Sequence, residues 1–416
     1  MQADPATGAS RDDLEVELLL RFAREAHFAG CPSDELERRV EELGQAVGRE
    51  VAVSATPTLI EVAIGSFPSQ RTSTIRVSPQ PVDLDLIGRL DDLAGRVRQH
   101  RLTPGDALAE LTALRPLRRP WPMVIGGYAL AGAAVVPALE GGWRESLAAA
   151  LLGLGVGAVA IAGRQRENTR AIVAPFAAIV ASLGCAMLAQ AGLAISVEVA
   201  TLGALVALLP GVALTIGMRE LATNHLQSGV ANAAVAFVQL VGLVFGVAVG
   251  SSIAAAWFGL APVHTPDSFG LEVKVGAAVL AGIAFTATLN GQRRDTPWAC
   301  GGTVLAILAD AALTPLIGDA AAVFVAALAV GLSGNVFALL RRRSALIIIV
   351  PGILMLVPGS LGYESATLLL EHDALGGVTA AFDTLVTALA IVYGLIVSAA
   401  VLPSRRPMVI GPPGAQ

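Results

Sequence analysis

The chain has 416 residues, of which 54% are hydrophobic and only 15% are charged, and its mean hydropathy is +0.68. This composition excludes a protein that is water-soluble throughout and indicates an integral membrane protein. The net charge of −5 says little about partners, because residues 1–119 hold 15 of the 28 basic residues and the rest is a series of apolar blocks. We therefore expect a soluble N-terminal part, a second part embedded in a lipid bilayer, and no binding to nucleic acid.

Residues 1–119 predict an α+β domain. Apolar residues recur at helical spacing in its first 47 residues, and runs of β-branched residues then alternate with polar ones. Ser33 is expected to cap the second helix with its side chain. The predicted helices lie near 12–29, 33–47, 83–100 and 105–114, and the predicted strands lie near 50–57, 59–66 and 72–79.

The N-terminus and the cysteines bound the compartment and the chemistry. The chain opens with the polar, acidic stretch MQADPATGASRDDLEVE, which lacks the basic and apolar regions of a cleaved signal peptide. We therefore expect the domain to stay in the cytoplasm. Cys31, Cys185 and Cys300 are too scattered for a disulfide framework, and no Cys/His cluster indicates a metal. We expect neither a metal nor a cofactor.

After residue 120 the chain predicts about ten transmembrane helices, each of roughly 18 to 25 residues. They lie near 121–139, 145–163, 171–191, 197–218, 229–250, 273–290, 297–316, 319–340, 345–363 and 377–402.

The basic residues of the connections predict the orientation. If the N-terminus is cytoplasmic, 11 arginines fall in cytoplasmic connections and only Arg144 and Lys274 fall in external ones. Positive residues concentrate on the cytoplasmic side of membrane proteins, so both termini are expected there. The cytoplasmic set is Arg164, Arg166, Arg170, Arg219, Arg293, Arg294, Arg341, Arg342, Arg343, Arg405 and Arg406.

The two halves of the membrane part resemble each other. LVALLPG at 205–211 matches LIIIVPG at 346–352, and residues 228–250 match residues 376–398 at a constant offset of 148. This places Gly246 on Gly394. Each half then has five spans, and an odd number means that the second half enters the membrane from the opposite side. We predict an inverted-topology repeat, which is common among secondary transporters.

The predicted fold is an α-helical polytopic membrane protein with two inverted five-helix repeats and an N-terminal cytoplasmic α+β domain. Its predicted parts are the domain (1–119), the first repeat (120–256), an external linker (257–272), the second repeat (273–403) and a cytoplasmic tail (404–416).

Pro-Gly pairs interrupt the fourth and ninth predicted spans. Proline removes a backbone donor and glycine weakens a helix, so we expect both spans to unwind and to offer main-chain groups to a small solute. The alternative is a packing kink in each helix. The predicted substrate-binding residues are Pro210, Gly211, Thr215, Asn232, Gln239, Pro351, Gly352, Pro358, Gly359 and Ser360.

Two acids lie well inside apolar spans, Asp310 in the seventh and Asp383 in the tenth. A charge at the centre of a membrane helix costs about 2.5–3.5 kcal/mol, so such residues usually serve a cavity, a partner or an ion path. We predict that one of them carries a coupling proton. The alternative is an interhelical hydrogen bond made by a neutral acid.

The order of these features resembles the threonine/serine exporter family. It has a soluble α+β domain, five spans that include LLPGVALTIGMREL, and a second half with the motif VPG. Residues near 10–260 resemble the larger part of two-component relatives, and residues near 270–402 resemble the smaller part. The resemblance implies export of L-threonine and L-serine across a bacterial inner membrane, driven by the proton motive force. Split relatives are associated with dicarboxylates such as succinate, so small dicarboxylates are the alternative cargo.

The domain has two further interpretations. His27 and Cys31 are four residues apart and are the only hint of a hydrolase, because residues 1–120 contain no GxSxG, P-loop or HExxH motif. We favour a regulatory or assembly role, and we expect the protein not to be an enzyme. The lack of a Walker sequence excludes an ATP-driven pump, whereas a channel and a homo-oligomer remain open.

Overall fold

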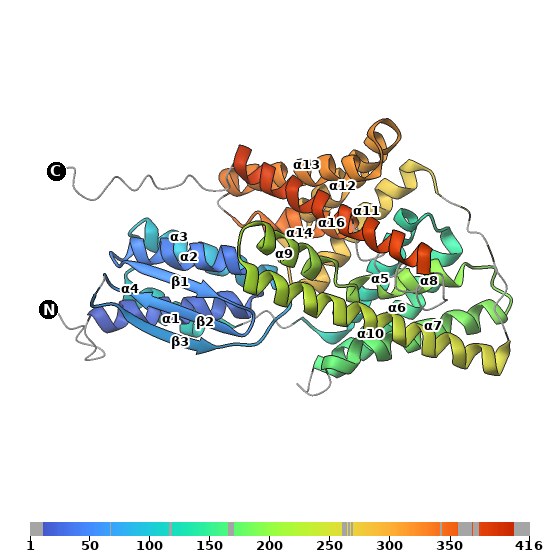
Figure 1. Cartoon of the computed structure of the whole chain (residues 1–416), viewed down its shortest axis with the longest axis horizontal. Helices are drawn as coiled ribbons and strands as arrows, with labels where there is room; N and C mark the ends of the chain where they lie inside the picture. The colour runs from blue at the N-terminus through green and yellow to red at the C-terminus, as the bar shows by residue number, and fades with distance from the viewer. Residues whose placement is uncertain are drawn as a thin grey trace.

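The computed structural model describes residues 11–66, 68–115, 119–164, 170–259, 264, 267, 269–341, 343–356, 368 and 374–402. Figure 1 shows the α+β domain at one end of the molecule and long helices that run away from it.

The domain contains the seven predicted elements in the predicted order. Its three strands form one antiparallel sheet in the order β1-β2-β3. The elements are α1 (Arg11–Phe28), α2 (Ser33–Ala46), β1 (Val51–Ala55), β2 (Leu59–Ile64), β3 (Arg71–Arg76), α3 (Leu84–Arg98) and α4 (Pro104–Ala113).

Alternation and helical spacing explain the domain core. Ile60, Val62 and Ile64 of β2 are buried, whereas Glu61 between them is exposed. Side chains on one face of a strand recur every second residue, so these three form one apolar face of the sheet. Phe22 of α1 is fully buried in the same apolar cluster.

The prediction that Ser33 caps α2 with its side chain is wrong. Pro32 occupies the N-cap position and no side chain of the helix caps it. Instead, the Ser33 backbone N–H donates to a carboxylate oxygen of Glu220, at 3.0 Å. A helix N-terminus leaves unpaired N–H groups, and here a distant element supplies the acceptor.

Eight helices among the described residues are long and apolar enough to cross a membrane, and the bent pair α8–α9 makes a ninth if it counts as one span. The first set comprises α5 (Trp121–Val135), η1 (Val136–Leu139), α6 (Trp143–Arg164), α7 (Arg170–Gln190), α8 (Val197–Leu205), η3 (Val206–Leu208), α9 (Gly211–Ala222) and α10 (Leu226–Phe258). The second comprises α11 (Leu271–Thr288), η4 (Arg293–Asp295), α12 (Thr296–Ile317), α13 (Asp319–Arg341), the short apolar helix α14 (Leu346–Leu356) and α16 (Ala374–Val401).

The helices of the two halves pack in corresponding pairs. α5 packs on α6, α6 on α7 and α7 on α10, and correspondingly α11 packs on α12, α12 on α13 and α13 on α16. Gly246 of α10 lies where a Cβ would collide with the backbone of α7, and Gly394 of α16 lies where a Cβ would be 2.6 Å from the Phe324 carbonyl oxygen of α13. Gly246 therefore permits α10 to cross closely over α7, and Gly394 permits α16 to cross closely over α13.

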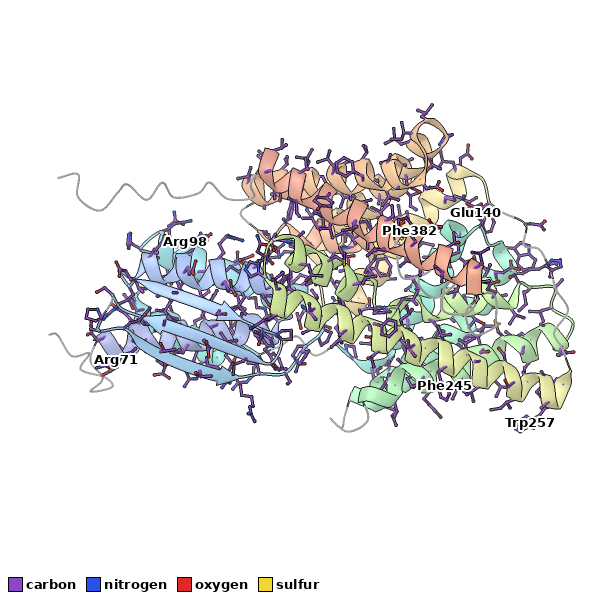
Figure 2. The ribbon with its side chains drawn as sticks, in the orientation of Figure 1. Arg71, Arg98, Glu140, Phe245, Trp257 and Phe382 are labelled. Atoms are coloured by element: carbon purple, nitrogen blue, oxygen red, sulfur yellow. The ribbon has the colours of Figure 1, made fainter. Side chains whose placement is uncertain are left out.

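Tryptophan marks both ends of the helices. The chain has four tryptophans, all at helix ends, and they are between 38% and 72% exposed. Trp121 begins α5, the first helix after the domain, Trp143 begins α6 and Trp298 lies in the first turn of α12, whereas Trp257, labelled in Figure 2, lies in the last turn of α10 at the end away from the domain. Tryptophan is enriched at both membrane–water interfaces, so the helices between these two levels have the arrangement of a membrane-spanning bundle.

One of the predicted helix interruptions is present. The segments before and after Leu209 and Pro210 differ in direction by 59°. The predicted interruption at Pro351-Gly352 is wrong, because α14 continues through both residues. A Cβ on Gly302 of α12 would lie 2.5 Å from the Ile348 carbonyl oxygen, so close packing on α12 keeps α14 helical around its proline. Pro358-Gly359 and Ser360 lie outside the described residues.

Candidate functional site

A small cavity lies where α9, α14 and α16 meet the domain. Its volume is about 30 Å³. One buried water needs roughly 10–15 Å³ on this measure, so the cavity in this conformation is smaller than an amino acid. The lining residues are Pro32, Val82, Val212, Thr215, Ile216, Arg219, Leu346, Ile349, Val350, Ile353 and Leu395.

Among the predicted binding residues that the structure describes, Thr215 alone lines this cavity. It is buried, and its hydroxyl donates to the Gly211 carbonyl oxygen at 2.9 Å. Pro210 is the N-cap of α9, and Gly211 is its first residue, so both lie at the bend. The bend therefore positions the first two turns of α9 along the cavity.

Gln239 closes the bend from α10. Its Nε2 donates to the Leu208 carbonyl oxygen at 2.8 Å. This carbonyl belongs to η3, directly before the interruption, and an unpaired carbonyl at membrane depth would cost several kcal/mol, on the order of a lost hydrogen bond in hydrocarbon. The predicted free main chain is therefore bonded by protein at this position.

Asn232 bonds to Glu220, an acid that is not among the predicted binding residues. Its Nδ2 donates to Glu220 at 2.6 Å, and the second Glu220 oxygen accepts the Ser33 N–H. Glu220 has no exposed surface. Its position in the motif GMREL, at the domain end of the apolar helix α9, was the available signal, because a buried acid there needs a partner from another element.

Residues 219–228 form the first contact of the bundle with the domain. Arg219 pairs with Asp34 at 2.7 Å and with Glu35 at 3.4 Å. His225 lies 3.0 Å from Glu37, and the Ser228 hydroxyl donates to the Ala55 carbonyl oxygen at 2.8 Å. The bend, α9 and the start of α10 are thus fixed to α2 and β1.

The α11–α12 connection forms the second contact. The Leu84 N–H at the start of α3 donates to the Leu289 carbonyl oxygen at 3.0 Å, and Asn290 donates to Asp83 at 3.0 Å. Gln292 also bonds to Asp85. The domain therefore holds a connection in each half of the bundle.

Pro351 and Gly352 are buried inside α14. A Cβ on Gly352 would lie 2.6 Å from a side-chain carbon of Val330, so this face of α14 packs tightly against α13. Their neighbours Val350 and Ile353 line the cavity, whereas the Pro-Gly pair does not.

The two predicted proton carriers lie apart from the cavity. Asp310 is half-buried, and the Thr314 hydroxyl lies 3.5 Å from its carboxylate. Thr303, two turns before Asp310 on α12, is fully buried and donates to the Ala278 carbonyl oxygen of α11 at 2.7 Å. Asp383 lies on an exposed side of α16.

The hydrolase interpretation loses its nucleophile. Cys31 is 7% exposed, and burial raises the pKa of its thiol to about 12. Burial also lowers the pKa of His27, with backbone hydrogen bonds opposing this. The thiolate is the reactive form of cysteine, so this thiol is inert at neutral pH. Within the described residues, no group of three His, Cys, Asp or Glu side chains is placed to hold a metal ion.

The long apolar helices indicate a multi-pass membrane protein, and a bent span of this kind is a feature of secondary transporters. Residues 17–254 match the family described as a threonine/serine exporter, and residues 274–401 match a second model described as Threonine/Serine exporter, ThrE. The chain belongs to the threonine/serine exporter family.

A curated relative extends the comparison to fungi. An uncharacterized protein of Schizosaccharomyces pombe is 24% identical over 372 residues, which cover 83% of this chain and 47% of the relative. The chain thus spans about half the length of that relative. No solved structure matches the chain.

Proposed function

We propose that this protein is a secondary exporter of small polar amino acids, L-threonine and L-serine, driven by the proton motive force. The observation that carries the proposal is the cavity beside the bent span, lined by α9, α14 and α16 from both halves of the bundle. Family membership supplies the transport class. Sites between the two repeats, next to discontinuous helices, are typical of secondary transporters.

The corresponding packing pairs support an inverted repeat. In such a fold, α5 to α10 and α11 to α16 move relative to each other around a site between them. The contacts of α9 with α14 and α16 lie at this junction. The bend at Pro210 is the main discontinuity among the described residues, because α14 is continuous through Pro351.

The positions of the arginines support a domain on the cytoplasmic side of the membrane. We propose that this membrane is a bacterial inner membrane. Arg219 pairs with the domain, and Arg343 pairs with Asp295 in the connection that the domain also binds. Glu140, with which Lys274 pairs, lies at the opposite end in Figure 2. Basic residues favour the cytoplasmic side, so the domain end is assigned to the cytoplasm, together with both termini.

The chemistry of the cavity favours an amino acid over a dicarboxylate. The lining is mostly aliphatic, with the buried Thr215 as its hydroxyl. A second carboxylate in such a site would lose its hydration without a dedicated partner, and burying an unpaired charge is costly. Threonine and serine are zwitterions with one carboxylate and no net charge, whereas a dicarboxylate would bring two negative charges.

Asp310 and Asp383 remain the acids proposed to carry the coupling proton. Each lies in a long apolar helix, where acidic side chains are rare and often mark an ion path. Coupled transport requires a group that can change its charge during the cycle. The test is transport by Asp310→Asn and Asp383→Asn, and unchanged pH dependence in both variants would reject the assignment.

Counterflow in proteoliposomes tests the transport function directly. Purified protein loaded with unlabelled L-threonine is expected to accumulate labelled L-threonine and L-serine but not succinate, and an imposed pH gradient is expected to increase the flux. Thr215→Val is expected to slow threonine counterflow by about tenfold, because one hydrogen-bonding group in a site is worth about 1–1.5 kcal/mol.

Thr288→Val is the matched control. Thr288 is half-buried in α11, and its hydroxyl bonds to the carbonyl oxygen of Ala284 in its own helix at 3.2 Å. It should leave the flux unchanged. Absence of counterflow with every amino acid and dicarboxylate tested would refute the proposed function.

A further inference from the structure

Arg219 is the one basic side chain in the lining of the cavity. It lies two turns beyond the bend, at the domain end of α9, and its side chain is 25% exposed. Its Nη2 lies 2.7 Å from an oxygen of Asp34 and its Nη1 lies 3.4 Å from an oxygen of Glu35. The two terminal nitrogens of the guanidinium are therefore each occupied by one carboxylate of the domain.

The same part of the domain forms the wall of the cavity. Pro32, which directly precedes α2, and Val82, which precedes α3, are the two lining residues that come from the domain. Pro32 is two residues from Asp34, so the wall and the carboxylates move together. The Ser33 N–H bond to Glu220 fixes this segment against α9.

We propose that Arg219 is the binding residue for the cargo carboxylate, and that Asp34 and Glu35 occupy it in place of cargo while the domain covers the cavity. The domain is then an internal competitor for the site as well as its lid. This inference rests on the proposed function, because it assigns a residue and a gate to the same cavity.

Guanidinium geometry supports the exchange. The planar fork of arginine binds a carboxylate through two parallel N–H bonds, so one cargo carboxylate can satisfy both nitrogens that Asp34 and Glu35 now share. One carboxylate would replace two, and the charge on Arg219 would remain paired throughout. Arginine therefore need not be left as an unpaired buried charge at any stage.

The domain can release Arg219 without leaving Glu35 unpaired. The second oxygen of Glu35 lies 3.1 Å from Arg39, which is itself 3.1 Å from Asp91. Burial alone would raise the pKa of Glu35, but Arg39, Arg219 and Arg38 together lower it to about 2. Glu35 thus stays ionised throughout the physiological range, so cargo rather than a proton on this group displaces the contact.

A labelling experiment tests the lid without any assumption about cargo. Ile216 lines the cavity, so Ile216→Cys is placed in a chain whose Cys31, Cys185 and Cys300 are replaced by alanine. The rate of maleimide labelling in detergent is measured with and without the double substitution Asp34→Asn and Glu35→Gln. We expect labelling to become about tenfold faster when these two pairs with Arg219 are removed, because local opening of this part of the domain exposes the cavity more often.

Glu42→Gln is the matched control, because Glu42 lies on the same helix but pairs with Arg38 and Arg98 inside the domain. It should leave the labelling rate unchanged. Equal rates in the double variant and its parent would overturn the lid. This test does not alter Arg219, so it stands even if variants of Arg219 fail to fold.

A cargo comparison tests the carboxylate assignment. L-threoninamide has the side chain and ammonium of threonine but no carboxylate. In counterflow, Arg219→Gln is expected to raise the half-saturation concentration of L-threonine by about tenfold and to change that of L-threoninamide by less than about twofold, as expected from loss of a charge-assisted pair. Arg219→Lys should recover part of the preference for threonine, because it keeps the charge but not the fork.

An equal rise in the half-saturation concentrations of L-threonine and L-threoninamide in Arg219→Gln would overturn the assignment. It would indicate that Arg219 only attaches the domain to the bundle. If the parent protein moves neither L-threonine nor L-serine, the proposed function fails. The labelling rates still decide in that event whether Asp34 and Glu35 hold the domain over the cavity.

Discussion

The two helices that carry a Pro-Gly pair, α8–α9 and α14, differ in outcome although their sequences are alike. α8 packs on α5, α6 and α7, whereas α9 packs on α10, α14 and α16. α14 packs mainly on α12 and α13, with smaller contacts to α11 and α9. Proline removes the same hydrogen bond in both. The comparison teaches that the Pro-Gly pair becomes a bend where the segments before and after it are held by different neighbours.

Close contacts fix each arrangement. A Cβ on Gly217 of α9 would lie 2.8 Å from the Ala233 nitrogen of α10, which draws the segment after the bend toward α10. A Cβ on Gly203 of α8 would instead lie 3.0 Å from the Cβ of Ala149 in α6. For α14, Gly302 of α12 leaves room for its backbone at Ile348, and Gly334 of α13 leaves room for the Ile349 side chain. The following changes test which contacts decide between a bend and a straight helix.

Gly302→Leu should have the largest effect. The new Cβ would lie 2.5 Å from the Ile348 carbonyl oxygen, so α14 would have to leave α12. Overpacking of a well-packed core costs typically about 1–3 kcal/mol and at a backbone contact more, so we expect a loss of about 3 kcal/mol. Thermal unfolding in detergent measures this loss.

Gly301→Leu is the control for that change, because a Cβ on the adjacent Gly301 meets no atom within 4 Å. It should leave the unfolding temperature nearly unchanged. Equal losses in the two variants would mean that close packing on α12 does not hold α14.

Gln239→Leu should have an intermediate effect. It leaves the Leu208 carbonyl at the bend without its partner, and an unsatisfied buried acceptor costs about 1–3 kcal/mol. Gln190→Leu removes a similar bond, to the Gly259 carbonyl oxygen, but from an exposed position, and should cost under about 0.5 kcal/mol. A Gln239→Leu variant as stable as Gln190→Leu would show that the bend does not depend on this bond.

Pro351→Ala should have the smallest effect. α14 is already helical at this position, so alanine adds a backbone donor without changing the path of the chain. We expect a change within about 1 kcal/mol, and an increase where the new N–H finds the Ile347 carbonyl. A large loss of stability or of transport would show that proline shapes α14 after all.

Local patterns predicted the elements that depend on local causes. The alternation around Glu61 and the helical spacing around Phe22 gave the domain, and the Pro210-Gly211 pair gave the bend. The prediction of an interruption at Pro351 was wrong because the path of α14 depends on its contact with Gly302, which is 49 positions away in the sequence. No local sequence pattern indicates a contact between residues so far apart.

The candidate site was harder to predict for the same reason. Thr215 was found because it follows the Pro-Gly pair within two turns. Arg219 and Glu220 looked like an ordinary charged helix end, and their partners at 33–35 are more than 180 residues away. The sequence places Asp383 well inside an apolar span, but the orientation of α16 in the bundle decides that its side chain is exposed.

The attachment of the soluble domain has a consequence for how the chain can be divided. The domain contacts residues 219–228 in one half of the bundle and the 289–292 connection in the other half. The peptide between Phe258 and Leu271 is thus one tie among several, since α5 and α11 also touch directly. A protein nicked in that stretch would keep both fragments on a common anchor, and two separately translated polypeptides would have a ready-made surface on which to assemble.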